Sequence, residues 1–256
     1  MSLDYQEKEE IGAVPDTQPE VIQRVTPVTP AFSIVLIVCI VLVWICQALF
    51  VSQKTILFGG QNSVIIAGFD KQFFLEGQYW RILTGAALHG GIIHLAFNAY
   101  ALYVLGKLVE FLSNRSHLAI VFLLSVIGGG LMSLAFLPDP SIGASGGIIG
   151  FLGYLTAYGF KRRKLLSNAF LKNMLFNIGF IAVMGIFIIP NVDNFGHLGG
   201  LLVGLIYGFI QVPSDLYKDP RETGKVTKIL GYVSLGIFIL TSIFTIFLIL
   251  LWKFYL

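Results

Sequence analysis

The sequence predicts an all-α membrane protein with seven helices that cross the bilayer. Of its 256 residues, 56% are hydrophobic and 12% are charged, a balance that excludes an ordinary soluble domain. Runs of roughly 20 uncharged residues, the length that a helix needs to cross a bilayer, account for nearly the whole chain. Both cysteines, Cys39 and Cys46, fall in the first of these runs, where packing is a commoner role than a disulfide.

The chain begins with a polar stretch, residues 1–30, whose prolines are Pro15, Pro19, Pro27 and Pro30. This composition is typical of a flexible, partly disordered lead-in. The stretch is too long and too acidic ahead of the first apolar run to be a signal peptide. We therefore expect a cytoplasmic N-terminal segment, followed by the first span at Ala31–Val51.

The next 35 or so residues, 52–87, contain no convincing span, and loops of this length usually carry structure of their own or a function. Their aromatic residues suit a membrane–water interface: Phe69, Phe73, Phe74, Tyr79 and Trp80. We expect a structured first loop that lies partly in the headgroup region.

Six further apolar runs complete the predicted membrane domain. They are expected at Leu88–Leu108, Leu118–Leu137, Ser145–Phe160, Asn173–Ile189, Phe195–Val212 and Ile229–Leu251. The first six spans form a core at residues 31–212. A polar cytoplasmic linker, residues 213–228, then leads to the seventh helix within 229–256.

The positions of lysine and arginine predict the orientation, because these residues are in excess on the cytoplasmic side. With the N-terminus in the cytoplasm and the C-terminus outside, 13 of the 17 fall on the inner side: Lys8, Arg24, Lys107, Arg115, Lys161, Arg162, Arg163, Lys164, Lys172, Lys218, Arg221, Lys225 and Lys228. The cluster Lys161–Lys164 also suits an anionic lipid or a nucleic acid, but a topology anchor is the commoner role. Nothing else in the sequence indicates nucleic-acid binding.

Two glycine-rich segments carry the residues that suggest chemistry. Ser145 lies within Gly143–Gly150 at the start of the fourth span, and His197 lies within Asn194–Gly200 at the start of the sixth. A Gly-x-Ser-x-Gly pattern alone is weak evidence, because no strand precedes it as in an α/β-hydrolase and small residues also serve helix packing. A serine and a histidine at the starts of two buried helices are, however, the parts of a nucleophile–base pair.

The predicted topology brings these residues to one depth. The second, fourth and sixth spans all run from outside to inside, so His94, Ser145 and His197 lie at a similar level near the outer leaflet. Smooth glycine faces let two helix axes approach closely. Such faces run along the fourth and sixth spans: Gly146, Gly150 and Gly153 on one, Gly196, Gly200, Gly204 and Gly208 on the other.

His94 and Asn98 are four residues apart and share one helix face. Both can donate hydrogen bonds to a developing oxyanion, together with the Ser145 backbone N–H. The alternative is a polar pair that holds two helices together. A zinc site at His89, His94 and His197 lacks an intramembrane carboxylate, so we expect no metal and no cofactor.

Asp193 precedes His197 by four residues and lies in a loop, where a turn is a commoner role than orienting the histidine of a triad.

Four motifs in register resemble the rhomboid family of intramembrane serine proteases over about Ala31–Val212. The motifs are Tyr79-Trp80-Arg81, His94-x-x-x-Asn98, Gly143-Ala144-Ser145-Gly146 and Gly196-His197-x-Gly199-Gly200. The resemblance implies a six-helix core plus one C-terminal helix, an arrangement that occurs in the family, and a Ser145–His197 dyad without a third acid.

The resemblance also implies roles for residues around the dyad. His94, Asn98 and the backbone at Gly143 and Ser145 would form the oxyanion site. Trp80 and Arg81 would lie in the half-embedded first loop, and Glu110 and Gly200 would support the structure. Ile149 departs from the pattern, because an aromatic residue often stacks there on the catalytic histidine.

The expected function is therefore intramembrane serine endopeptidase, cleaving transmembrane segments of membrane proteins within the lipid bilayer. The fifth span, with Phe176, Phe180 and Phe187, would be the gate to the site together with the loop Pro190–Asn194. The composition favours a bacterial plasma membrane.

Two other classes of function stay open. One is an inactive homologue that binds transmembrane helices. The other is a transporter, which the absence of intramembrane charges and inverted repeats disfavours. Oligomeric state is not predicted.

Overall fold

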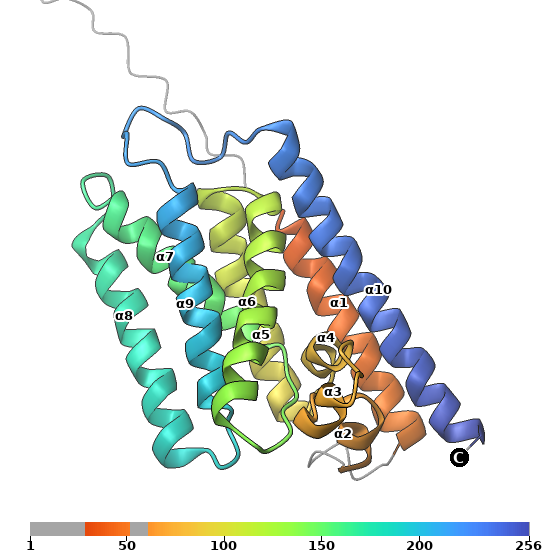
Figure 1. The fold of residues 1–256 in the computed structure, drawn as a ribbon. Coiled ribbons are helices and arrows are strands. Elements are labelled where there is room, and N and C mark those ends of the chain that lie inside the picture. Colours follow the sequence, from red (N-terminus) through yellow and green to blue (C-terminus); the bar gives the residue numbers. More distant parts are fainter. Residues whose placement is uncertain (1–28, 52–60, 256) are drawn as a thin grey trace, which may run out of the picture.

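The computed structural model describes residues 29–51 and 61–255, so the predicted N-terminal segment lies almost wholly outside the described residues. Within these two ranges, seven long helices form a bundle, and three short helices lie against one end of it (Figure 1). The long helices are α1 (Ala31–Cys46), α5 (Ile92–Leu112), α6 (Arg115–Phe136), α7 (Ser145–Lys161), α8 (Asn168–Val183), α9 (Asn194–Gln211) and α10 (Lys225–Tyr255). The described residues contain no β-strand, only one isolated bridge between Phe69 and Ser141. The prediction of an all-α polytopic membrane protein is confirmed.

Five of the long helices described are long and apolar enough to cross a membrane, namely α1 with its π-helical extension Gln47–Val51, α5, α6, α8 with its extension Met184–Ile188, and α10. The other two, α7 and α9, do not reach the same length and hydropathy. Their 17 and 18 residues include many glycines and the polar residues of the predicted site. The helices with the weakest membrane signal are thus the ones that carry Ser145 and His197.

Several helix boundaries differ from the predicted spans. α5 begins at Ile92 rather than Leu88, because Gly91 adopts φ +146°, a conformation that only glycine tolerates well. α6 begins three residues early, at Arg115, because the Asn114 side chain accepts hydrogen bonds from the backbone N–H groups of Ser116 and His117. α8 likewise begins early, at Asn168.

The described part of the first loop, residues 61–87, is largely helical, which the sequence did not predict. It holds α2 (Gln61–Ala67), α3 (Lys71–Leu75) and α4 (Arg81–Ala87). Arg81 is buried, and its guanidinium donates to the backbone carbonyls of Ile65 (2.9 Å) and Gly68 (2.9 Å). The Ile65 carbonyl lies in the last turn of α2, where carbonyls lack a partner within the helix, and Gly68 directly follows the helix. Arg81 therefore fixes α2 against α4.

Close backbone packing of α9 on α7 and α6 forms the centre of the bundle (Figure 1). A Cβ added at Gly200 would collide with the carbonyl oxygen of Gly146, and one added at Gly204 would collide with that of Gly150. The predicted glycine faces of the fourth and sixth spans therefore do meet. Gly199 faces α6 instead, where an added Cβ would lie 2.6 Å from the carbonyl oxygen of Gly128.

Buried polar contacts tie α1 to the start and end of α5. The Glu110 carboxylate near the end of α5 accepts hydrogen bonds from the Ser33 backbone N–H (2.9 Å) and hydroxyl (2.7 Å). At the other end, the Gln47 side chain donates to the His89 carbonyl (3.2 Å) and accepts from the His89 N–H (3.0 Å). These bonds hold the entry to α5 in place.

The seventh long helix, α10, packs along α1 and α6 and reaches the first loop (Figure 1). It has 31 residues and is therefore about 46 Å long, more than the roughly 30 Å of a bilayer core. In its C-terminal half, Phe244 meets the Trp80 ring edge-to-face, with 5.4 Å between ring centroids. α10 therefore supports the loop that carries the Trp80-Arg81 motif.

The glycine crossing predicts how two alanine substitutions differ. Gly204→Ala forces α9 away from the Gly150 carbonyl and should lower the free energy of unfolding by about 1–3 kcal/mol. Thermal unfolding in a mild detergent measures the loss. Gly236→Ala on α10 is the matched control, since an added Cβ there meets nothing within 4 Å. Equal stability of both variants would contradict the packing described.

Candidate active site

Ser145 is the first residue of α7, and the segment before it is held by the first loop. Gly143 donates its backbone N–H to the Gly85 carbonyl (2.9 Å), and Ser141 exchanges two backbone hydrogen bonds with Phe69 (3.0 and 3.1 Å). Gly143 itself has φ +123°, which strongly favours glycine. The position of Ser145 therefore depends on the first loop as much as on α7.

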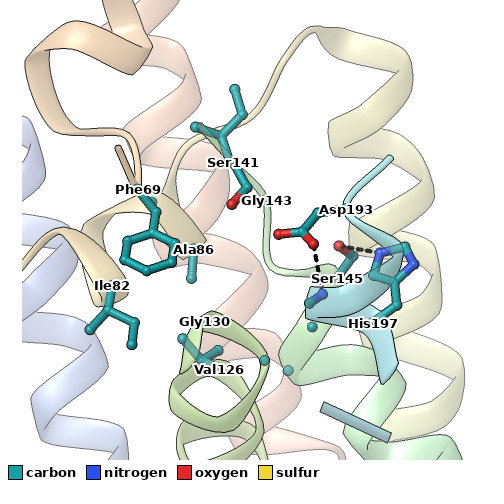
Figure 2. A pocket seen from close by; sticks show the side chains of 16 residues that line it. Phe69, Ile82, Ala86, Val126, Gly130, Ser141, Gly143, Ser145, Asp193 and His197 are labelled. Carbon is teal, nitrogen blue, oxygen red and sulfur yellow. Dashed lines mark hydrogen bonds between the residues drawn. The ribbon is translucent and has the colours of Figure 1, made fainter. Parts of the chain in front are cut away.

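The Ser145 hydroxyl faces His197 in the first turn of α9. Ser145 Oγ lies 2.8 Å from His197 Nε2, within hydrogen-bond distance (Figure 2). The other ring nitrogen, Nδ1, is buried and has no hydrogen-bond partner among the described residues. Serine and histidine thus form a pair to which no described carboxylate is bonded.

Asp193 acts as the N-cap of α9. One carboxylate oxygen accepts from the Gly196 backbone N–H (2.6 Å), and the other accepts from the Ser133 hydroxyl on α6 (2.5 Å). Figure 2 shows its carboxylate beside the serine–histidine pair and bonded to the helix start rather than to His197. Asp193 therefore fixes the turn that carries His197, in agreement with its interpretation as a turn residue.

A polar chain that the sequence analysis missed joins Asp193 to the first loop. Lys71 on α3 donates to the Ser141 hydroxyl (2.7 Å) and to the Asp139 carbonyl (2.5 Å), and Ser141 Oγ lies 3.4 Å from Ser133 Oγ. Burial lowers the pKa of Lys71 to about 8. Nearby carboxylates partly oppose this shift by raising the pKa, and Asp193 has the largest effect among them. Lys71 thus stays mostly protonated at neutral pH. A lone lysine in an aromatic loop gives no sequence signal for this contact.

His94 lies against the segment that precedes Ser145. A Cβ added at Gly143 would come within 2.8 Å of His94 Nε2, so glycine is required there for space as well as for φ. His94 Nδ1 accepts a hydrogen bond from the Gly90 backbone N–H at 3.3 Å. This assigns the proton to Nε2 in the neutral ring and makes Nε2 a donor on the Gly143 side.

Asn98 is buried one turn further along α5, and its amide nitrogen donates to the His94 carbonyl (2.9 Å). No hydrogen bond links it to Ser145 or Gly143 in the described part of the chain. One amide N–H of Asn98 remains free of this bond. The structure therefore brings His94 directly against the segment that precedes Ser145. Asn98 lies on the same face of α5 as His94 but makes no hydrogen bond to that segment among the described residues.

A small cavity of about 50 Å³ adjoins the serine. Its wall includes Ser145, His197, Asp193, Phe69 and Ile82, so polar groups cluster on one side and apolar groups on the other (Figure 2). A cavity of this size, with Ser145, Asp193 and His197 as polar partners, holds water molecules but not a larger ligand.

The remaining predicted residues lie outside this cavity. Trp80, Arg81 and Glu110 make the loop and helix contacts described above, and Gly200 lies at the α7–α9 crossing. Ile149 is buried on α7, one turn after Ser145. Two glycines of α6 that the sequence analysis did not single out, Gly128 and Gly129, face α9, and an added Cβ at Gly129 would lie 2.6 Å from the Gly196 carbonyl oxygen. Gly129 also lines the cavity.

Comparison with known proteins gives consistent matches. A family model described as the Rhomboid domain matches residues 76–214. The Rhomboid protease GluP of Bacillus subtilis (strain 168) is 36% identical over 156 residues, which cover 60% of this chain and 28% of that protein. Two Arabidopsis thaliana proteins also match. RHOMBOID-like protein 6, mitochondrial, is 36% identical over 163 residues (60% of this chain, 52% of that protein). RHOMBOID-like protein 4 is 31% identical over 147 residues (57% and 37%). The chain thus matches 28% to 52% of the length of these relatives.

The capping role of Asp193 predicts a graded effect of substitution. Asp193→Ala removes the acceptor of the Gly196 N–H and leaves the Ser133 hydroxyl without its partner, which should lower the free energy of unfolding by about 1–2 kcal/mol. Asp193→Asn keeps a side-chain oxygen for the cap, so its free energy of unfolding should fall by at most half as much as that of Asp193→Ala. Thermal unfolding of both variants makes the comparison. An alanine variant as stable as the asparagine variant would show that the cap contributes nothing.

Proposed function

The chain belongs to the rhomboid family, and we propose that it is an intramembrane serine endopeptidase with Ser145 as nucleophile and His197 as general base. The observation that carries the proposal is the 2.8 Å hydrogen bond between Ser145 Oγ and His197 Nε2. A serine hydroxyl becomes a useful nucleophile only when a base takes its proton, and histidine is the usual base near neutral pH. The relative named as a protease supports the same activity.

In the proposed acylation step, Ser145 Oγ attacks the carbonyl carbon of the scissile peptide bond and its proton passes to His197 Nε2. The carbonyl oxygen becomes an oxyanion. When the tetrahedral intermediate collapses, the C–N bond breaks and His197 gives its proton to the leaving amine. In the second step His197 takes a proton from water, the resulting hydroxide attacks the acyl carbon, and Ser145 Oγ leaves with a proton from His197.

We assign the oxyanion site to His94 Nε2–H and the backbone N–H of Ser145, near Gly143. The hydrogen bond from Gly90 to His94 Nδ1 supports this assignment, because it leaves Nε2 as the donor. The position of Gly143 against the His94 ring supports it as well. The free N–H of Asn98 is the further donor. Preorganised donors of this kind lower the barrier by stabilising charge that develops only in the transition state.

The proposed substrates are single-span membrane proteins, cut near the outer end of a transmembrane helix. A helix hides its carbonyls in its own hydrogen bonds, so the scissile segment must unwind before Ser145 can reach it. The small cavity beside Ser145, with polar groups on one side, supports the water supply for hydrolysis. The membrane-spanning helices establish an integral membrane protein, and we propose a bacterial plasma membrane with the N-terminus in the cytoplasm and the C-terminus outside.

We further propose that α8 is the gate for the substrate. It contacts mainly α7, and only Met174 is buried along its length, so it is loosely held in comparison with α6, α7 or α9. Near its far end, the Asn194 amide donates to the Gly185 carbonyl (3.0 Å) and links the π-helical extension to the start of α9. Lateral movement of α8 would open a path from the bilayer to Ser145.

The proposed activity predicts loss of cleavage in two variants. Ser145→Ala and His197→Ala should each lower the cleavage rate of a single-span substrate in proteoliposomes by at least about a thousandfold, since nucleophile and base act as a unit. Quantitative electrophoresis gives the rates, and mass spectrometry of the products gives the cut bond. Folding is checked by thermal unfolding of each variant.

A well-folded wild-type protein that binds such a substrate without cutting it would instead support the inactive, helix-binding alternative. Cleavage that persists in Ser145→Ala would overturn the assignment of the nucleophile.

The gate is tested by a reversible cross-link. An added Cβ at Gly185 lies 3.4 Å from Asn194 Cγ, the position that the Sγ of a cysteine at 194 would occupy, so Gly185→Cys with Asn194→Cys brings the two thiols within reach of each other. In a background with Cys39 and Cys46 replaced by alanine, oxidation should slow cleavage of a helical substrate at least about tenfold. Reduction of the same protein is the control and should restore the rate. Equal rates in both redox states would exclude a gate at this end of α8.

A further inference from the structure

A second, larger cavity lies at the opposite end of α7 from the serine. Its volume is about 350 Å³, and its wall combines the ends of α5 and α7 with the linker between α9 and α10. The linker lies at the upper end of the bundle in Figure 1, away from α2 to α4. α7 has 17 residues, so this cavity lies about 25 Å from Ser145. It is therefore independent of the proposed active site.

The linker that covers this cavity is held in place by side chains. Arg162, directly after α7, donates to the carbonyls of Asp215 (2.8 Å) and Lys218. Asn114, between α5 and α6, donates to the Arg221 carbonyl (3.1 Å). Three bonds to backbone carbonyls thus fix the segment 215–221 over the helix ends. The cavity is therefore formed by segments that are hydrogen-bonded to one another.

Arg162 has no hydrogen-bonded carboxylate in the described part of this wall. Its side chain is only 2% exposed, and its Nε–H is buried without a hydrogen-bond partner. Both hydrogen bonds that it makes go to neutral carbonyls, and no described carboxylate hydrogen-bonds to it. A guanidinium has five N–H donors, so most of its capacity for an acidic partner is unused. A buried charge of this kind is stabilised by an anion.

The rest of the lining adds to the positive charge. Lys218 and Arg221 also line the cavity, and Asp219 is the single carboxylate in the wall. Asp219 pairs with Arg221 (2.8 Å), and these hydrogen bonds lower the pKa of the Asp219 carboxyl below its ordinary value. Asp219 hydrogen-bonds to Arg221 and also lies within the electrostatic reach of Arg162, but one carboxylate offsets only one of the three positive charges, so the wall stays net positive. Tyr158, Phe111 and Leu112 supply the less polar part of the lining.

We propose that this cavity binds a phosphate-bearing anion, with Arg162, Lys218 and Arg221 as its cationic partners. Guanidinium groups match the geometry of phosphate oxygens and are the usual residues for such recognition. The cavity lies where the helices leave the apolar layer, so a lipid headgroup can enter it while its chains stay among Phe111 and other apolar residues. A free phosphate offers the same chemistry without the chains.

Thermal unfolding of the purified full chain in a neutral detergent tests the proposal. Phosphatidylglycerol, phosphatidylcholine, and inorganic phosphate against chloride at equal ionic strength are each titrated into separate samples. A ligand of the folded state raises the unfolding temperature and its effect saturates. Saturation by phosphatidylglycerol alone assigns a lipid headgroup. Saturation by inorganic phosphate as well assigns the phosphate group itself.

Charge variants localise the effect to the cavity. Lys218→Gln should weaken the apparent affinity for the saturating anion about fivefold. Asp219→Asn should strengthen it by a similar factor, because Arg221 then loses its paired carboxylate and can bind the anion. Arg163→Gln is the matched control, since Arg163 is an exposed neighbour that does not line the cavity. Arg162→Gln is less suitable alone, because it also releases the linker.

Three results would overturn the proposal. These are no saturable effect of any anion, an equal effect of phosphatidylcholine and phosphatidylglycerol, and a loss of affinity in Arg163→Gln as large as that in Lys218→Gln.

Discussion

Backbone contact between α7 and α9 determines where the two reactive side chains lie. The carbonyls of Gly146 and Gly150 leave no room for a Cβ at Gly200 or Gly204, so the two helix axes approach more closely than helices with larger side chains. Ser145 and His197 stand at the starts of these helices and meet at 2.8 Å as a consequence. In a bilayer, where apolar surface gains little from leaving lipid, such packing and the hydrogen bonds beside it are what hold helices together.

The first loop completes the arrangement that this crossing begins. It binds the segment before Ser145 through Gly85 and Phe69, and it reaches the cap of α9 through Lys71, Ser141 and Ser133. Arg81 and the Trp80–Phe244 contact fix the loop itself, the latter through α10. Serine and histidine are thus oriented from one side by helix packing and from the other by a hydrogen-bonded loop. The α8 helix takes little part in either, which agrees with a helix that is free to move.

The sequence predicted the parts of this arrangement that are periodic or local. Glycines spaced four residues apart predicted the helix faces that meet, and the positions of His94, Ser145 and His197 at three helix starts predicted their common level. The chain Lys71–Ser141–Ser133–Asp193 was not predictable, because it joins four segments whose approach depends on the tertiary fold. The start of α5 at Ile92 depends on the backbone conformation of Gly91, which an apolar run does not encode. Gly128 and Gly129 acquire a role only once α9 is seen against α6.

The central claim is that His197 activates Ser145. Its most direct test is the rate at which a fluorophosphonate probe labels the purified protein in detergent, with the labelled residue identified by mass spectrometry. We expect wild type to be labelled at Ser145 and His197→Ala, folded to the same extent, to be labelled at least about a hundredfold more slowly. Labelling of His197→Ala at the wild-type rate, or absence of labelling in well-folded wild type, would contradict the claim.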